Sequence, residues 1–545
     1  MDVVDANPDP EPDPDPGVGV DVDVDVLIVG GGPVGLAARV LLERWGVRTL
    51  LVERHRELSP FPRSRLVNVR SMEILRQLGL AERLTAVAFP AKYGRIRFRD
   101  TLRGPDFATA AMVGVREAVP ESPVRGVVSS QDRLEPLLLG AAAGEIRFGT
   151  ELTALRDTGT GVIADLADRE RGTSARIGAR FLLAADGAGS AVRRLLGIGV
   201  HGPGELGRTT TVVFDADLAE WSDREPAGMY VTAHGSFLPL YPEGGWAWFG
   251  PTPEGAAHTD WGALVRRALG AARDGDGGVP GPATDVDVLR VQHWTMNAFV
   301  ADRLRHGRIL LAGDAAHAVP IVGGLGMNTG IGDVHNLCWK LAGVLKGWAR
   351  PALLDTYAPE RHPVAERVLE QSVANTRLMA EVQAHRRARL AAGPAEADPG
   401  RVELPWTDQY FAQMGLVLGV AYESTAVLRE PSGTGPAPAG GTDYVPTPHP
   451  GHRLPHLWLT PTRSTLDTLG EHFTLLTASP PPHLPATPWP LSVQSLAPRH
   501  ADAYGLAPGG ALLVRPDGHI AARFPDAPPT PATLTGALDA ITGGG

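Results

Sequence analysis

The feature that most constrains this chain is a glycine-rich turn within residues 21–54, between an apolar strand pattern and a helical pattern. Gly30, Gly32 and Gly35 fill the G-x-G-x-x-G template. In that template the glycines provide a tight turn, close approach of the backbone to a pyrophosphate, and packing of the helix against the strand. Pro33 stands where the helix should begin, and its missing N–H costs nothing there. The segment therefore predicts a Rossmann-like unit that binds an adenine dinucleotide.

The end of the next strand supports this interpretation. Glu53 occupies a position from which a carboxylate can accept a hydrogen bond from a ribose hydroxyl. The first N–H groups of the helix and its dipole would face the phosphates. The template alone does not separate FAD from NAD, and in a chain with 65 glycines an ordinary glycine turn is the alternative.

Charge and composition exclude several classes of protein. The 545 residues suggest roughly two to four domains. Nine acidic residues and no basic residue fall within positions 1–25, so most of the net charge of −10 is local. No basic stripe interleaved with aromatics suggests nucleic-acid binding. The Pro-rich acidic stretch over residues 1–20 has too little apolar material to fold and is expected to be a disordered tail.

The charge of the first residues, the apolar runs and the cysteine count indicate the cellular compartment and bear on metal binding. The acidic start has the wrong charge for a signal peptide, and no apolar run is long enough to span a bilayer. Cys338 is the single cysteine, which excludes an internal disulfide and a cysteine metal cage. We therefore expect a cytoplasmic protein with no membrane contact and no metal.

Two later apolar segments also end in an acid. Residues 181–187 carry Asp186 and residues 308–314 carry Asp314. A glycine-rich loop follows the second segment and leads into a helix predicted over residues 333–345. Because a helix start presents free N–H groups and partial positive charge, an anion or a cofactor edge that becomes anionic belongs there.

Alternating residues over 205–300, with strand-like residues over 89–125, predict a second sheet with one covered face. Aromatic residues in such strands are usually plain core, although a broad sheet can also form the wall of a pocket for a flat ligand. Only residues on the covered face can contribute to that pocket. The candidates for this wall are Phe237, Trp246, Trp248 and Trp294.

The last third of the chain reads as a long charged helix, linkers and a small domain. The helix is predicted from residue 357 to about 392, with Pro363 as a point of interruption. Stretches rich in Pro and Gly over 393–404 and 430–452 predict linkers. Beyond them, Arg515-Pro516-Asp517-Gly518 between two apolar runs indicates a hairpin in an α/β domain.

The glycine turn, Ala185-Asp186-Gly187 and Gly313-Asp314-Ala315-Ala316-His317, in this order, resemble one family. This family comprises the FAD-dependent single-component aromatic hydroxylases related to para-hydroxybenzoate hydroxylase and phenol hydroxylase. Within the family, the chain most resembles the actinobacterial polyketide hydroxylases. The resemblance covers about residues 21–530. It implies an α/β fold with a Rossmann-like FAD-binding domain, an inserted β-sheet substrate domain and a C-terminal thioredoxin-like domain.

The resemblance also gives domain limits. The FAD-binding domain would span 21–400, with the substrate sheet inserted at about 85–125 and 200–300. A linker would span 401–450 and the thioredoxin-like domain 451–545. Since no Cys-x-x-Cys exists in the chain, the last domain cannot carry out dithiol chemistry. A role in packing or in a homodimer contact is therefore expected for it.

Residue by residue, the resemblance implies a set of FAD contacts. The pyrophosphate would contact Gly30, Gly32, Val34 and Gly35. The adenosine ribose would contact Glu53, with Arg54 beside it. The adenine would contact the backbone of Leu152. Arg65 would lie over the pyrophosphate near the path of NAD(P)H, and Gln131 would face the ribityl chain. Asp186 would serve FAD and NAD(P)H, Asp314 would bond the ribityl hydroxyls, and the flavin ring would be bordered by Pro320, Gly326, Met327 and Asn328. The sequence departs from the family pattern at two positions. Ile321 follows Pro320 where a second proline is common, and Gly332 stands where glutamine is common. Both positions bear on the shape of the pocket near the flavin.

The resemblance implies that NADPH or NADH reduces FAD, that O₂ forms a C4a-hydroperoxide, and that an electron-rich ring takes the distal oxygen. The substrate would be a multi-ring aromatic polyketide. No catalytic residue or base is named, and His317 is as consistent with a structural histidine as with a catalytic one. Two alternatives stay open: a Baeyer–Villiger monooxygenase acting on a related polyketide, and a flavin-binding protein without turnover.

Overall fold

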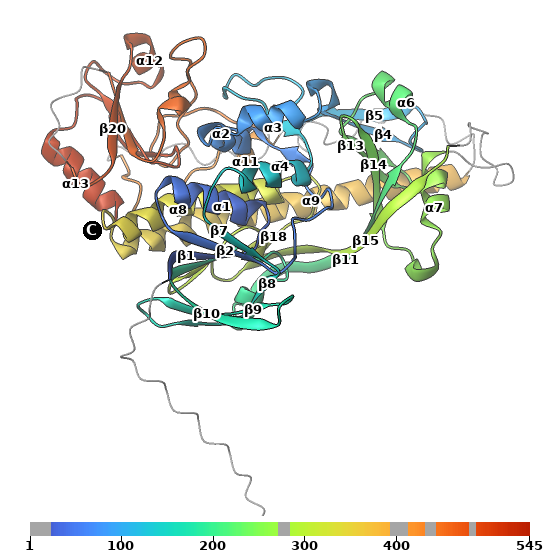
Figure 1. Ribbon diagram of the computed structural model, residues 1–545. Helices are drawn as coiled ribbons and strands as arrows, with labels where there is room; N and C mark the ends of the chain where they lie inside the picture. The colour runs from blue at the N-terminus through green and yellow to red at the C-terminus, as the bar shows by residue number, and fades with distance from the viewer. Residues whose placement is uncertain (1–22, 271–283, 393–412, 431–442, 479–486, 545) are drawn as a thin grey trace, which may run out of the picture.

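The computed structural model describes residues 23–270, 284–392, 413–430, 443–478 and 487–544. The acidic tail predicted over residues 1–20 lies outside this part of the chain, as does much of the predicted linker over 401–450. The described residues form two large mixed layers and a smaller C-terminal α/β unit (Figure 1). Within these described ranges, no helix combines the length and apolar character required to cross a membrane.

The first sheet carries the glycine turn. Its strand order is β16 (Arg305–His306), β17 (Ile309–Leu311), β10 (Thr173–Ala184), β1 (Val24–Val29), β2 (Thr49–Glu53) and β7 (Glu145–Phe148), with β9 (Val162–Asp168) and β8 (Thr150–Asp157) joined through β10. β1 lies between β10 and β2 and runs parallel to both. Val26, Leu27 and Ile28 are fully buried, as expected for a parallel strand covered on both faces. The carboxyl ends of β1, β2, β10 and β17 share one edge, called here the carboxyl edge of the first sheet.

Helices α1 (Pro33–Arg44) and α8 (Gly326–Lys346) belong to the core of the first sheet. They touch where the thiol of Cys338 reaches the carbonyl of Ala38. The prediction that α8 begins at residue 333 is wrong, because the helix already begins at Gly326. Glycine disfavours helices, but Gly330 is required for packing: a Cβ there would lie 2.5 Å from Val34 Cγ2.

Further helices cover the same layer. They are α2 (Val69–Gln77), α3 (Ala81–Val87), α4 (Gln131–Leu139) and α5 (Ala191–Leu195). The side chain of Asn68 caps α2 by accepting from the Ser71 N–H, and Ser190 caps α5 in the same way. A short ladder of β3 (Leu66–Val67) with β6 (Val127–Val128) lies beside them.

The second sheet has the order β18 (His317–Ala318), β15 (Asp287–Ala301), β11 (Val200–Asp215), β14 (Gly244–Pro251), β13 (Gly235–Tyr241), β12 (Met229–Thr232), β4 (Arg95–Arg99) and β5 (Asp106–Ala111). It therefore combines the two sequence regions that predicted a second sheet. Helices α6 (Ala219–Arg224) and α7 (Trp261–Leu269) pack on one of its faces.

Helix α9 (Tyr357–Ala392) connects the two layers. Its 36 residues give a rod about 54 Å long. Figure 1 shows it running from the α8 side of the molecule to the second sheet. Near its C-terminal end, Gln383 donates to the Thr232 carbonyl of β12 at 3.1 Å. The interruption considered at Pro363 does not occur, because this residue lies near the helix start and removes a single backbone hydrogen bond.

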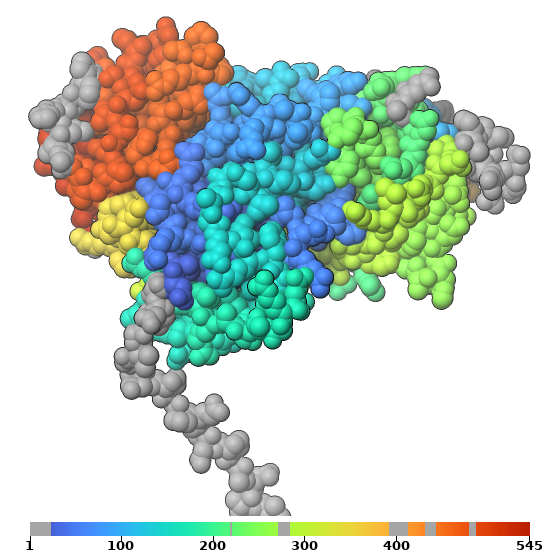
Figure 2. Space-filling model, in the orientation of Figure 1, coloured from blue at the N-terminus to red at the C-terminus, as the bar shows by residue number. Residues whose placement is uncertain are grey.

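The C-terminal unit has the strand order β20 (Leu491–Ser495), β19 (Phe473–Thr477), β21 (Ala511–Val514) and β22 (Ile520–Phe524). β19 and β20 are parallel, and β21 and β22 form the predicted hairpin. Helices α12 (Pro498–Ala503) and α13 (Pro531–Ile541) complete it. This order is that of a thioredoxin-like core. Figure 2 shows the unit seated at one end of the molecule, against the blue N-terminal region.

Candidate functional site

The glycine turn brings three distant segments together. Gly30 has φ +112°, and a Cβ on it would lie 2.3 Å from the Ala185 carbonyl oxygen. A Cβ on Gly35 would lie 2.0 Å from the Gly30 carbonyl oxygen. Val34 reaches the third segment, because its Cγ2 lies 2.8 Å from a Cβ built on Gly313. The residues next to Asp186 and Asp314 therefore meet the turn at the carboxyl edge of the first sheet.

Gly32 differs from its neighbours in the turn. Its backbone is extended, and a Cβ built on it meets no described heavy atom within 4 Å. It is the N-cap of α1, and no described side chain caps this helix. The start of α1 thus presents backbone N–H groups and the positive end of the helix dipole toward open space, which suits a phosphate pair.

Helix α8 presents a second start of this kind. Its N-cap is Leu325, and again the helix receives no cap from any side chain that the structure describes. The side chain of Asn328 is occupied, since its amide donates to the carbonyls of Leu66 at 2.9 Å and Gly324 at 2.7 Å. Its oxygen accepts from the Asn68 N–H. What α8 can offer a ligand is therefore the backbone of Gly326, Met327 and Asn328.

Glu53 ends β2 beside the turn. One carboxylate oxygen accepts from the Gly31 N–H at 2.7 Å, and the other accepts from the His55 N–H at 2.8 Å. A carboxylate has further lone pairs, so a ribose hydroxyl can still donate to it. Arg54 is exposed next to it.

Leu152 is buried in β8, and the pairing of β8 with β9 shifts register just after it. Such a bulge leaves a backbone group unpaired, which is compatible with the expected adenine contact. That contact stays a prediction.

Asp314 lies in a short 3-10 turn directly after β17, flanked by the fully buried Ala315. Solvent reaches the Asp314 side chain, yet protein surrounds it closely. Burial raises the pKa of Asp314, and the positive charges of His317 and Arg63 partly oppose the rise. An acid in this position has hydrogen-bonding capacity that no side chain or backbone group of the described residues fills.

Asp186 follows β10 at the same edge. Its Oδ2 accepts from the Val192 N–H at 3.1 Å, at the start of α5. Its Oδ1 is buried and has no partner among the described residues. Since an unsatisfied buried carboxylate oxygen is costly, this atom is suited to receive a hydrogen bond from a ligand. Together with the open backbone at Gly32, it fits a dinucleotide lying along the edge.

Arg65 is bound to the second sheet. Its guanidinium donates to the Leu240 carbonyl at 2.5 Å and to the Pro239 carbonyl, both in β13. Burial lowers the pKa of Arg65 to about 10, and Asp132 and Tyr241 oppose this shift. Arg65 therefore joins the first layer to the second sheet in this structure, and its position over a pyrophosphate stays a prediction.

Gln131 has a hydrogen-bond partner on its own helix, Glu135. Its amide donates to Glu135 Oε1 at 2.7 Å, while Glu135 Oε2 is buried with no described partner. Burial raises the pKa of Glu135 to about 7, although the hydrogen bond from Gln131 and the charge of Arg63 act against the rise. The i, i+4 spacing of Gln131 and Glu135 on α4 was the available signal.

His317 lies inside the protein beside an acid of α8. It is fully buried, and its Nε2 lies 2.6 Å from Asp333 Oδ2. The other oxygen of Asp333 accepts from Arg361 Nε at 2.7 Å. Although burial alone would raise it, the charges of His317 and Arg361 hold the pKa of Asp333 below its usual value. A Cβ on Gly332 would lie 3.1 Å from Arg361 Nη2, so glycine at this position leaves room for the arginine.

Three of the four aromatic residues expected in the wall of a substrate pocket lie on one face of the second sheet and belong to its core. Phe237, Trp246 and Trp248 are buried with α7 residues in one packed cluster. Leu238, Leu240, Val213 and Ala247 form the opposite face, against which Phe61 of the first layer packs. In this structure the three aromatics are core of the second sheet, and the opposite face is the one turned toward the first layer. The alternation predicted two faces but not which of them is turned inward.

Trp294 differs from these three. Its indole N–H donates to Thr211 Oγ1 at 3.0 Å, and it is half-buried. Its neighbour His293 contacts Trp261 of α7, so Trp294 points to the other face by strand alternation. Of the four candidates, it is the one that faces the side of Leu238 and Leu240.

Comparisons with known proteins agree with this geometry. A family model described as FAD binding domain matches residues 23–372, and one described as aromatic-ring hydroxylase, C-terminal matches residues 447–544. The chain is 36% identical to 4-methyl-5-nitrocatechol 5-monooxygenase from Burkholderia sp, over 94% of this chain and 97% of that protein. It is 35% identical to aklavinone 12-hydroxylase RdmE from Streptomyces purpurascens, over 94% and 97%.

A solved structure gives the same result. The flavin-dependent monooxygenase PieE, in complex with FAD and substrate, superposes with a TM-score of 0.83 at 30% identity, covering 97% of this chain and 100% of that one. Because its relatives are named monooxygenases and hydroxylases, the interpretation as a flavin-binding protein without turnover is not supported. The chain belongs to the FAD-dependent aromatic-ring hydroxylases, the flavin monooxygenases that include the polyketide hydroxylases.

Proposed function

We propose that this monooxygenase uses NAD(P)H and O₂ to hydroxylate a multi-ring aromatic polyketide. The observation that supports the proposal best is the meeting of Gly32, Asp186, Asp314 and the start of α8 at the carboxyl edge of the first sheet. The strands that end at Glu53, at the glycine turn, at Asp186 and at Asp314 are consecutive in the sheet, in the order β2, β1, β10, β17.

The proposed roles follow from the chemistry of each group. The start of α1 at Gly32 binds the pyrophosphate, and Glu53 accepts from the adenosine ribose. Asp314 accepts from the ribityl hydroxyls. When bound, FAD supplies the redox chemistry, taking a hydride from NAD(P)H and activating O₂. The backbone N–H groups at Gly326 and Met327, at the start of α8, would stabilise negative charge on the reduced flavin.

The substrate pocket is proposed on the face of the second sheet turned toward the first layer. Leu238, Leu240 and Val213 give it an apolar surface, and Phe249 and Trp294 border it. A flat apolar face of this kind suits a fused-ring substrate. The relative acting on aklavinone supports a multi-ring substrate, whereas the relative acting on a nitrocatechol supports a single ring.

Turnover with candidate substrates tests the proposal. We expect yellow protein that consumes NADPH or NADH and O₂ faster when a polycyclic phenol is added, and a product heavier by one oxygen atom. A nitrocatechol serves as the single-ring comparison. Ring connectivity in the product separates hydroxylation from Baeyer–Villiger insertion. Stimulation by the nitrocatechol alone would contradict the polyketide assignment.

Asp314→Ala tests the ribityl contact. Hydrogen bonds to charged groups contribute about 1.5–3 kcal/mol, so the Kd for FAD should rise about 10- to 100-fold. Titration of apoprotein with FAD, followed by flavin fluorescence, measures this change. Asp287→Asn, at an exposed position of β15, is the control and should leave the affinity unchanged. An unaltered Kd in Asp314→Ala would remove Asp314 from the cofactor site.

A further inference from the structure

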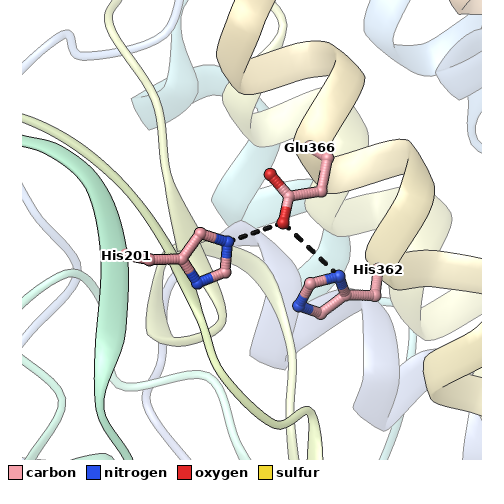
Figure 3. Close-up of side chains that lie close together, drawn as sticks. All are labelled: His201, His362 and Glu366. Carbon is pink, nitrogen blue, oxygen red and sulfur yellow. Dashed lines mark hydrogen bonds and ion pairs between the residues drawn. The ribbon is translucent and has the colours of Figure 1, made fainter.

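Three side chains outside the cofactor site form a cluster with the spacing of metal ligands. His362 and Glu366 stand one turn apart on α9, and His201 reaches them from β11 (Figure 3). His201 Nε2 lies 2.6 Å from Glu366 Oε1, and His362 Nδ1 lies 3.6 Å from the same oxygen. One ligand atom from each of the three residues lies within 4.8 Å of the others.

Hydrogen bonds on the far side of each ring orient the two histidines. His362 Nε2 lies 3.2 Å from the Ala301 carbonyl oxygen, which can only accept, so this nitrogen carries the proton. In the neutral ring, Nδ1 then carries the lone pair, and it faces Glu366. His201 Nδ1 lies 3.0 Å from Asp302 Oδ1, which leaves Nε2 as the nitrogen that faces Glu366. Carbonyl or carboxylate partners behind ligating histidines are characteristic of metal sites.

His201 Nε2 and Glu366 Oε1 both accept hydrogen bonds when His201 is neutral, so their close contact requires a proton or a metal ion between them. If Nδ1 donates to Asp302, a neutral ring has only a lone pair at Nε2, which would repel the Glu366 oxygen at 2.6 Å. Either a second proton or a metal ion removes this repulsion. A metal ion would also accept the lone pair that a neutral His362 carries at Nδ1, and so would join all three side chains at one point.

We propose that His201, His362 and Glu366 form a zinc site with an open fourth position. Two imidazole nitrogens and one carboxylate are a common zinc ligand set, with bonds of about 2.0–2.2 Å. Tetrahedral bonds of that length place ligand atoms about 3.3 Å apart. The two distances to Glu366, 2.6 and 3.6 Å, lie on either side of this value. Because all three side chains are between a quarter and a half exposed, small rotations are enough to reach it.

The location gives the site a structural consequence. β11 begins where the chain leaves α5 of the first layer, and Asp302 directly follows β15, where the chain returns to β16. The backbone joins these two crossings, since the Asp302 N–H donates to the Gly199 carbonyl at 2.9 Å. An ion bound here would hold both crossings to α9 and so restrain the two layers relative to each other.

Zinc binding to the FAD-loaded enzyme tests the site. Titration calorimetry with Zn²⁺ alone should show one equivalent bound per chain, and the thermal midpoint should rise when Zn²⁺ is added. X-ray absorption of the zinc-loaded protein should show two imidazole nitrogens at about 2.0–2.1 Å. His201→Ala and His362→Ala should each lower the affinity by at least about 10- to 100-fold. Asp302→Asn, which alters only the partner behind His201, should weaken binding within about the same range.

His258→Ala is the matched control, because His258 is an exposed histidine elsewhere, in a 3-10 turn (Ala256–His258). It should bind zinc like the parent enzyme. Flavin content checks that every variant is folded. The proposal is overturned if no saturable binding of one equivalent occurs, or if His201→Ala and His362→Ala bind zinc as tightly as the parent, which would place the ion elsewhere.

Discussion

Replacing Glu360 by glutamine is expected to lower the free energy of unfolding by about 3–5 kcal/mol, because the change leaves a buried positive charge without its partner. Glu360 is fully buried on α9. Its two oxygens accept from Arg515 at 2.7 and 2.8 Å, and one of them also accepts from Lys340 at 2.7 Å. This carboxylate therefore joins α8, α9 and the C-terminal unit at one point.

The charges around Glu360 are balanced. Arg515 also pairs with Asp517, so two cations meet two carboxylates. Burial alone would raise the pKa of Glu360, but Arg515 and Lys340 hold it well below its usual value. The acid thus stays ionised at every ordinary pH, and glutamine, which carries no charge, cannot replace it.

Denaturant unfolding measures the effect of Glu360→Gln. Glu423→Gln is the matched control, because Glu423 pairs with Arg429 on the surface and should change stability by no more than about 0.5 kcal/mol. A double variant, Glu360→Gln with Lys340→Met, removes the stranded charge and should recover part of the loss. If Glu360→Gln unfolds like the control, the C-terminal unit is not anchored by this cluster.

This cluster bears on the role of the C-terminal unit. The sequence left packing and a dimer contact as its two roles. Arg453 forms a second buried ion pair, with Glu73 of α2, at 2.9 Å between Nε and Oε2. Two buried ion pairs within one chain favour packing. Neither was visible in the sequence, because the partners stand 155 and 380 residues apart and share no motif.

The elements that the sequence predicted well are those set by local chemistry. Strand, glycine turn and helix followed from residues close together in the chain, and so did the hairpin after Val514. The start of α8 was missed, since Gly326 and Gly330 signal a loop locally, whereas in the structure Gly330 packs against Gly313 and Val34 inside the helix. The inward face of the second sheet was also missed, because alternation gives two faces and only the layers packed on them distinguish the faces.

Replacing Gly30 by alanine should abolish FAD binding and should also lower the free energy of unfolding. Gly30 has φ +112°, which an L-residue adopts only with strain, and the new methyl would lie 2.3 Å from the Ala185 carbonyl oxygen. Strain and overlap together should cost about 3 kcal/mol or more. The carbonyl belongs to backbone next to β10, so it cannot move without disturbing the parallel pairing of β1 with β10.

Gly32→Ala separates the fold from the ligand. Its extended backbone accepts any residue, and its Cβ would meet no atom within 4 Å in the part of the chain that the structure describes. Apoprotein stability should therefore change by no more than about 0.5 kcal/mol. The methyl would, however, stand where the pyrophosphate must approach the start of α1, so FAD affinity should fall at least tenfold. Gly536→Ala, at an exposed position inside α13, is the control and should retain FAD fully. If Gly32→Ala bound FAD as tightly as this control, the pyrophosphate could not lie at the start of α1.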